Sequence, residues 1–336
     1  MEKRKPEEYA FPCSLVRAGE KKILGQADLE KLVDCKTVNQ AMAILADFGY
    51  GDGRELPNPR EFEKVLNKGL AEAYQMIFSA APDREELEFF IYPGDYHNIK
   101  ALLKAEALNI EGEPYLTENG RFASETMVRM VRERDFVFMT TCMKNGINEA
   151  LDVFAKSNDP QEIDIILDRA CYRDMLEKAC EVGSEFLIGY VKLLIDILNV
   201  TSFVRLRKIG KPQGFFQKVF LKGGNMEEKL FEASWEDTFQ KLSEKMGPFG
   251  FKDAFGTGAA EAAAPGGTFT ALEKITDNML MKYIKDAKYI SFGIEPLAAY
   301  LVAKDMENKN LRMILAGIVT ETPKNITLER LRVPYV

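Results

Sequence analysis

The amino-acid sequence predicts an all-α protein, and three observations support that prediction. Apolar residues recur at steps of three and four, as at Leu29, Leu32 and Val33, and again along most of the chain. No segment alternates apolar and polar residues between hairpin turns, which is the pattern of strands. One pattern of residues occurs three times, at intervals of 101 and 111 residues, as is typical of folds built from repeated helical units.

Helices are expected along most of the chain. The predicted helical segments are 29–45, 61–79, 84–92, 97–109, 122–143, 160–182, 184–208, 269–289 and 295–317. Thr37 with Gln40, and Ser234 with Asp237, have the spacing of N-terminal capping boxes, so a helix is expected to begin just after Thr37 and another just after Ser234. The Gly- and Ala-rich stretch 247–267 has few periodic apolar residues and is expected to be a mobile loop.

Composition and charge argue against several classes of protein. The 336-residue chain has 45 Lys and Arg against 52 Asp and Glu, a net charge of −7, so it lacks the excess of cations of a general nucleic-acid binder. Its five cysteines form no C-x-x-C pair and have no histidine at metal-binding spacing, which indicates reduced thiols and no metal or cofactor site.

The chain is not expected to cross a membrane. The longest apolar stretch, 186–200, is interrupted by Lys192 and Asp196 and is too short to span a bilayer. The N-terminus is charged and has no apolar core of a signal peptide. These features predict a protein on the cytoplasmic side, without direct membrane insertion.

The repeated pattern is an acidic residue, then Asn three positions later, then an aliphatic residue. Its copies are Asp95 with Asn98, Asp196 with Asn199, and Glu307 with Asn310. A second landmark on an earlier helix precedes each Asn by 31, 31 and 33 residues, at Asn67, Asp168 and Asp277. A third parallel aligns 24–29 with 221–226, whereas the middle copy, around 121–142, is less clear. The copies predict three helical domains, 1–112, 113–213 and 214–336, the last containing the 247–267 loop.

The acid and the Asn of each copy lie on one face of a helix, about one turn apart. Two interpretations are open: a buried polar lock between helices, in which the Asn amide bonds a neighbouring helix end, or a direct contact with a partner protein. Basic residues follow each motif and could pair with acids or with a partner. The candidate residues are Asp95, Asn98, Lys100, Asp196, Asn199, Arg205, Arg207, Glu307, Asn310 and Arg312.

Four stretches, in order along nearly the whole chain, carry a resemblance to a known family. They are the N-terminal arm with Arg17, Glu20, Asp28-Leu29-Glu30 and Tyr50, then 96–108, 195–210, and 295–318 with the tail 328–336. Together they resemble the C-subunit family (the d subunit in eukaryotes) of V-type rotary ATPases and ATP synthases.

The resemblance implies three similar helical domains in a pseudo-threefold, funnel-shaped arrangement. It implies a non-catalytic central-stalk component, a socket that couples the central shaft, formed by the D and F subunits, to the membrane proteolipid ring for H⁺ or Na⁺ transport. It implies that the nucleotide site and the ion site belong to other subunits, and that no cofactor is bound.

Two other classes of function stay open. A generic helical scaffold unrelated to ATPases would form an open, concave solenoid. A helical enzyme of unrecognised type would have a deep pocket, with Asp95 and the single histidine, His97, as the candidates nearest to chemistry. No phosphate-binding Gly-rich motif is present, and one active site gives no reason for three acid–Asn pairs in step.

Overall fold

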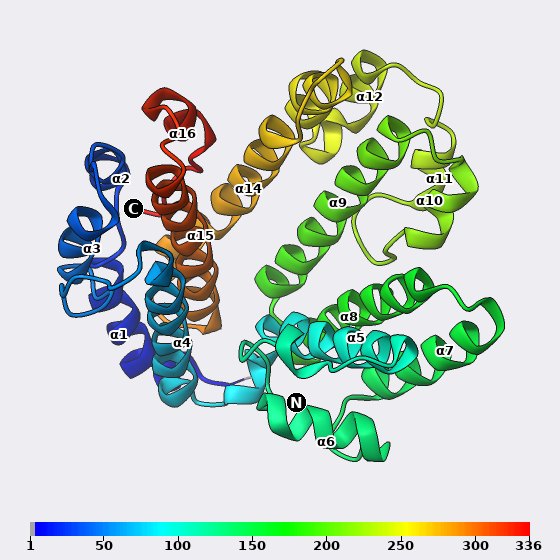
Figure 1. The fold of residues 1–336 in the computed structure, drawn as a ribbon, viewed down its shortest axis with the longest axis horizontal. Helices are drawn as coiled ribbons and strands as arrows, with labels where there is room; N and C mark the ends of the chain where they lie inside the picture. The colour runs from blue at the N-terminus through cyan, green and yellow to red at the C-terminus, as the bar shows by residue number, and fades with distance from the viewer. Residues whose placement is uncertain (1–3) are drawn as a thin grey trace. The chain divides into compact units, whose positions relative to one another are not determined.

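Every regular element of the structure is a helix. The structure is a computed structural model that describes residues 4–336, and no strand occurs in that part of the chain (Figure 1). The prediction of an all-α protein is therefore confirmed. The described chain forms two compact units: a middle unit of residues 85–236, and a terminal unit in which the segment before residue 85 packs with 237–336.

The middle unit is built around the long helix α8, which contacts α7, α5 and α9. Its helices are α5 (Tyr92–Leu108), α6 (Ser124–Glu133), α7 (Thr141–Ser157), α8 (Pro160–Val182), α9 (Glu185–Lys208), α10 (Gln213–Val219) and α11 (Glu228–Glu232). Helices α7 and α8 approach closely at Gly146, where an added Cβ would lie 2.8 Å from the Cβ of Ala170. A glycine is needed there because no side chain fits between the two helices.

Helix α9 is long and apolar enough to pass a test for a membrane span based on length and composition alone, and it is the one described helix that does. Its apolar side chains include Val191, Ile195 and Phe203, which are fully buried within the protein. Phe203 meets the rings of Phe216 and Trp235 at centroid distances of 5.5 and 5.2 Å, which anchors α10 and the residues after α11 to α9. The apolar run thus has the ordinary surroundings of a core helix.

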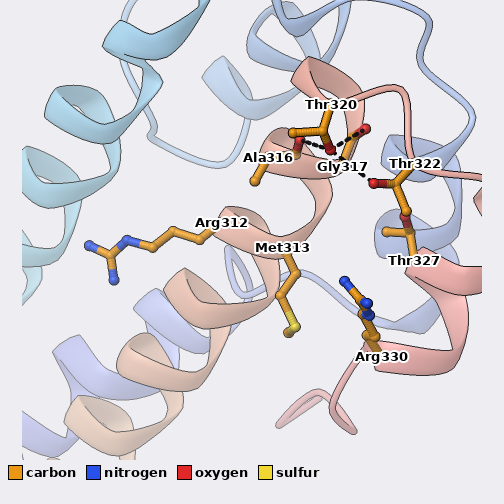
Figure 2. A pocket seen from close by; sticks show the side chains of 8 residues that line it. All are labelled: Arg312, Met313, Ala316, Gly317, Thr320, Thr322, Thr327 and Arg330. Atoms are coloured by element: carbon orange, nitrogen blue, oxygen red, sulfur yellow. Dashed lines mark hydrogen bonds between the residues drawn. The ribbon is translucent and has the colours of Figure 1, made fainter. Parts of the chain in front are cut away.

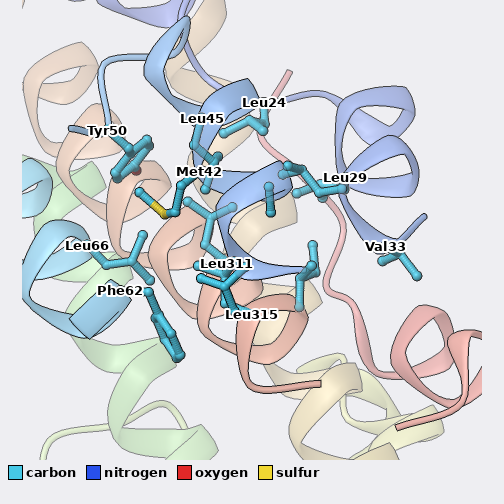
Figure 3. Close-up of a cluster of buried hydrophobic side chains, with 14 of the residues drawn as sticks. Leu24, Leu29, Val33, Met42, Leu45, Tyr50, Phe62, Leu66, Leu311 and Leu315 are labelled. Atoms are coloured by element: carbon cyan, nitrogen blue, oxygen red, sulfur yellow. The ribbon is translucent and has the colours of Figure 1, made fainter. Parts of the chain in front are cut away.

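The terminal unit is built around α15, whose long buried face contacts α4, α1 and α14. Its helices are α1 (Ala10–Glu20), α2 (Gln26–Val33), α3 (Val38–Ala46), α4 (Phe62–Ala80), α12 (Phe239–Met246), α13 (Ala260–Ala263), α14 (Thr270–Ile284), α15 (Ile294–Val319) and α16 (Lys324–Arg330). Leu311 and Leu315 of α15 pack with Leu29, Leu45 and Leu66 in one buried apolar cluster (Figure 3). The cluster joins helices from both ends of the sequence.

Three helices begin with the same device. Thr37, Thr140 and Thr238 precede α3, α7 and α12, and each hydroxyl accepts a hydrogen bond from the backbone N–H three residues later, at 3.2, 3.0 and 3.3 Å. The prediction at Thr37 is confirmed. The prediction at Ser234 is wrong, because the helix begins after Thr238 and the Asp237 carboxylate pairs with Lys241, at 3.1 Å.

Two predicted segments differ from the structure. The segment 122–143 is not one helix: α6 ends at Glu133, Arg134 adopts a left-handed conformation (φ 57°), and α7 begins only at Thr141. Val137 and Phe138 continue the apolar pattern in the sequence, yet they are 71% and 75% exposed. The segment 84–92 forms two short 3₁₀ turns and the start of α5.

The Gly- and Ala-rich stretch is not an irregular loop. It forms a 3₁₀ turn at Gly247–Phe249, a π-helical turn at Ala254–Ala259 and the short α13. The side chains of Phe251 and Phe255 are fully buried. Small residues suit this stretch because it packs directly on α14: a Cβ at Gly258 would lie 2.7 Å from the Cα of Leu272.

Candidate functional site

The three copies of the motif lie on α5, α9 and α15, the last long helix of each copy. Their acidic and Asn side chains are at most 4% exposed. Each copy faces a non-helical stretch that comes after its helix, and we call these stretches straps: 117–122, 221–226 and 332–336. The first two straps lie in the middle unit and the third in the terminal unit.

Each motif Asn forms the same pair of hydrogen bonds. Its amide N–H donates to the carbonyl of one strap residue, and its amide oxygen accepts from the N–H of that same residue. The pairs are Asn98 with Thr117 (2.8 and 2.8 Å), Asn199 with Leu221 (2.8 and 2.8 Å) and Asn310 with Arg332 (3.1 and 2.9 Å). The amide thus mimics a neighbouring strand and satisfies strap groups that lack helical partners. In each copy the paired residue directly follows the C-cap of a helix or 3₁₀ turn, so the Asn amide binds the chain at a neighbouring helix end, as the sequence suggested.

The two acids of the middle unit hold the far end of their straps. The Asp95 carboxylate accepts the N–H groups of Arg121 (2.8 Å) and Phe122 (3.2 Å). The Asp196 carboxylate accepts those of Asn225 (3.0 Å) and Met226 (3.1 Å). Two consecutive backbone donors on one carboxylate form a small anion-binding turn, so each acid fixes the point at which the chain leaves the strap.

A glycine stands before these donors in both straps, and sequence reasoning missed it. A Cβ at Gly120 would lie 2.4 Å from Oδ1 of Asp95, and a Cβ at Gly224 would lie 2.2 Å from Oδ1 of Asp196. Only glycine lets the backbone come this close to the carboxylate. The signal was available in the sequence as a glycine placed directly before each donor pair.

The acid of the third copy has different partners. Glu307 Oε1 accepts the N–H of Leu24 at 2.7 Å, and Oε2 accepts the hydroxyl of Tyr50 at 2.6 Å. Lys304 forms an ion pair with Glu307 and donates to the Tyr50 hydroxyl at 2.8 Å. All four residues are at most 6% exposed. Burial, together with the Glu307 charge, raises the pKa of Tyr50 far above its ordinary value, so the phenol stays a donor.

This contact corrects one alignment of the repeat. The sequence suggested that Leu24 corresponds to Leu221, but Leu24 binds the motif acid as Phe122 and Met226 do. Each of these three residues also stands two positions before a helix, α2, α6 and α11 respectively. The similar runs Leu-Gly-Gln-Ala-Asp and Leu-Lys-Gly-Gly-Asn suggested a register five residues away from the one observed.

Two basic candidates join the motif helices to the second landmark. Lys100 and Arg312 both stand two positions after a motif Asn. Lys100 pairs with Asp168 of α8 at 2.6 Å. Arg312 pairs with Glu63 of α4 at 2.9 Å and donates to Asn67. Asp168 and Asn67 are landmark positions, and in both contacts the motif helix of one copy binds the landmark of another copy.

The other two basic candidates lie away from the straps. Arg205 is exposed near the C-terminal end of α9. The Arg207 guanidinium lies over the ring of Phe203, 5.3 Å from its centroid. Thr201 occupies the position that corresponds to Lys100 and Arg312, and its hydroxyl donates to the carbonyl of Ile197 in its own helix.

The described residues contain no cluster that could hold a metal ion. No group of three His, Cys, Asp or Glu side chains could hold a metal ion among them, and the five cysteines are free. His97 is exposed, with Nε2 3.0 Å from the carbonyl oxygen of Tyr115. A pocket of about 260 Å³ at the end of α15 is lined by Arg312, Met313, Arg330 and three threonines, without a carboxylate or thiol (Figure 2).

The buried Asp95 is expected to make the stability of the middle unit depend on pH. Burial raises the pKa of Asp95 to about 6, and its Oδ2 accepts no hydrogen bond from the described residues. The folded protein therefore binds this proton more tightly than the unfolded chain, whose carboxyl titrates near ~3.9. The stability due to the protonated carboxyl is complete below about pH 4 and is lost as the pH rises through about 6.

We expect wild type to lose up to about 3 kcal/mol relative to Asp95→Asn between pH 4 and pH 7. Urea denaturation followed by the fluorescence of Trp235, the single tryptophan, measures this in the middle unit. Asp152→Asn, at an exposed acid of α7, is the matched control. A difference between wild type and Asp95→Asn that is the same at every pH would contradict the expectation.

Comparison with known proteins gives one family. The model of the ATP synthase (C/AC39) subunit family matches residues 12–330. The C subunit of the V-type sodium ATPase of Enterococcus hirae is 22% identical over 332 residues, which cover 98% of this chain and 99% of that protein. The C subunits of the A-type ATP synthases of Pyrococcus horikoshii and Methanocaldococcus jannaschii are 22% and 24% identical, over 91% and 96% of this chain and 85% of each relative.

Proposed function

Because the chain belongs to the ATP synthase (C/AC39) subunit family, we propose that it is the non-catalytic central-stalk component of a V-type rotary ATPase or ATP synthase. In this role it is a socket that connects the shaft, formed by the D and F subunits, to the membrane proteolipid ring. It transmits torque between nucleotide chemistry in the soluble head and the movement of H⁺ or Na⁺ in the membrane. It works at the cytoplasmic face as a peripheral part of the membrane complex.

One observation carries the proposal: the similarity extends over the whole chain. The family model covers residues 12–330, and the Enterococcus hirae protein is matched over 99% of its own length. A protein that shared only a helical repeat with this family would be expected to match over one copy. The all-helical architecture of the described residues is compatible with a mechanical role.

We further propose that the three sequence copies, 1–112, 113–213 and 214–336, are three similar domains arranged as a pseudo-threefold funnel. The motif residues then have a structural role. Burial and bonds to the straps support this assignment for Asp95, Asn98, Asp196, Asn199 and Asn310. Burial and the bonds to Leu24 and Tyr50 support it for Glu307. Lys100 and Arg312 join helices within their units. Arg205, which is exposed near the C-terminal end of α9, is the candidate for contact with a partner protein.

Native mass spectrometry of the protein mixed with purified D and F subunits from the same source tests this function. We expect a stable complex with one copy of each protein, and no ATP hydrolysis by this chain alone. No complex, under conditions in which the D–F shaft itself stays intact, would overturn the socket and favour a generic scaffold.

Arg205→Glu tests the contact surface in the same experiment. If Arg205 faces an acidic partner, charge reversal weakens the complex more at low salt than at high salt, because salt screens exposed charges. Lys208→Glu, at an exposed basic residue three positions later on α9, is the comparison variant. Equal weakening by Arg205→Glu at both salt concentrations would show that electrostatic attraction at Arg205 does not contribute to the contact.

A further inference from the structure

We propose that the two ends of the chain together form the third strap, and that Leu24 occupies the position that would directly follow Val336. The first two straps are continuous chain. The third is divided between the C-terminal residues 332–336 and the segment that begins at Leu24. The C-terminal tail then acts as a latch that holds the N-terminal helices on α15. This inference does not depend on the proposed function.

The spacing within the two continuous straps sets the register. In each of them, the residue paired with the motif Asn is followed, five positions later, by a residue whose N–H binds the motif acid. Thr117 and Phe122 have this relation in the first strap, and Leu221 and Met226 have it in the second. Five positions is therefore the distance along the chain that separates the two anchor points.

The third strap keeps this register across the break in the chain. Arg332 pairs with Asn310, and Val336, four positions later, is the last residue. The N–H bound by the motif acid Glu307 belongs to Leu24. Leu24 thus supplies the fifth position. As in the other copies, a helix begins two residues after this donor, at Gln26.

The two ends lie next to each other. A Cβ at Gly25 would be 3.9 Å from Cγ2 of Val336, an ordinary van der Waals contact. The tail is fixed along its length: the Val333 N–H donates to Asn278 at 2.9 Å, and Lys288 donates to the carbonyl of Tyr335 at 2.6 Å. The buried Tyr335 also reaches back to the N-terminal region, where its hydroxyl donates to Glu20 at 3.2 Å.

The divided strap explains why the third acid differs from the other two. A continuous strap supplies two consecutive N–H groups to an Asp, whereas Glu307 accepts one backbone N–H, that of Leu24. Glu is one methylene longer than Asp and reaches Leu24, and its second oxygen is occupied by Lys304 and Tyr50. Lys304 and Tyr50 thus stand where Asp95 and Asp196 each have a second backbone donor.

A reversible disulfide between the two ends tests the register. In a Cys180→Ser background, which removes the exposed thiol, Gly25→Cys with Val336→Cys is compared with Gly25→Cys with Val333→Cys. Val336 and Val333 are matched in exposure, at 45% and 46%. Gly25 has φ −86°, a conformation that any residue adopts. We expect the 25–336 pair to oxidise to an intramolecular disulfide at least tenfold faster than the 25–333 pair. Equal rates, or faster oxidation of the 25–333 pair, would overturn the register.

Hydrogen exchange on the oxidised and reduced forms of the 25–336 variant tests the latch. If the contact between the C-terminal tail and residues 24–25 opens and exposes the N-terminal segment, the amides of 24–33 exchange at least tenfold more slowly in the oxidised form. The amides of α8, in the middle unit, serve as the internal reference. The same exchange rate for 24–33 in both forms would show that this contact does not open, and would overturn the proposal that the tail acts as a latch.

Discussion

Replacing Glu307 with Gln is expected to destabilise the terminal unit by about 3–5 kcal/mol. Glu307 and Lys304 are 4% and 6% exposed, so the substitution leaves a buried ammonium group without a counter-charge. The amide oxygen of Gln can still accept the Leu24 N–H, so the loss of stability measures the effect of removing the carboxylate charge and not of changing the side-chain shape. Hydrogen exchange of α15 amides is the measurement, because Trp235 lies in the middle unit and does not report on this one.

Two further variants show whether the loss is specific to the buried Lys304–Glu307 pair or would follow from breaking any ion pair of this unit. Lys304→Met with Glu307→Gln removes both charges and is expected to recover most of the stability, since a buried pair can be replaced by apolar or neutral groups at little cost. Glu63→Gln, on α4, removes the partner of Arg312, which is on α15 like Glu307. The Glu63 and Arg312 side chains are 47% and 41% exposed, so this substitution is expected to cost less than about 1 kcal/mol. If Glu307→Gln costs no more than Glu63→Gln, the buried ion pair does not hold the unit together.

Replacing Asn199 with Leu is expected to destabilise the middle unit by about 2–6 kcal/mol. Asn199 satisfies both the N–H and the carbonyl of Leu221, and all of these groups are buried. Leucine has a similar volume but no polar atom, so two backbone groups lose their partner, at about 1–3 kcal/mol each. Urea denaturation followed by Trp235 fluorescence measures the loss, since Trp235 packs on Phe203 one turn further along α9.

Thr201→Val is the matched control for Asn199→Leu. It removes a polar group from the same helix two positions away, but the Thr201 hydroxyl bonds only a carbonyl of its own helix, at 2.8 Å. Such a bond adds little to helix stability, so we expect a change of less than about 0.5 kcal/mol. A loss for Asn199→Leu as small as that for Thr201→Val would mean that the strap is held by its apolar contacts alone.

The sequence predicted the helical class and the motif because both depend on local spacing. The steps of three and four residues identify the buried faces of α4, α8 and α15, and the acid and Asn of each motif share one such face. The partners of the motif could not be predicted in the same way. Leu24 is 283 residues from Glu307, and the Asn side chains bind backbone groups, which every residue carries.

The errors have physical causes that lie outside local pattern. Val137 and Phe138 continued an apolar rhythm although the structure leaves them exposed, so the break between α6 and α7 was missed. In 247–267, the Ala and Gly content predicts a loop, whereas the small size of these residues allows helical turns to pack against α14 at Gly258. Periodicity records which residues are apolar but not how closely two backbones approach.

The pairing of each motif Asn with strap backbone has a consequence for how the sequences of the three copies can diverge. The residues that the amides hold are Thr117, Leu221 and Arg332, which share neither charge, size nor polarity. Because the Asn amide bonds only the backbone N–H and carbonyl of its partner, these hydrogen bonds do not restrict which side chain the partner carries. Each strap can therefore carry a different side chain at this position while the Asn keeps the same two hydrogen bonds to its backbone.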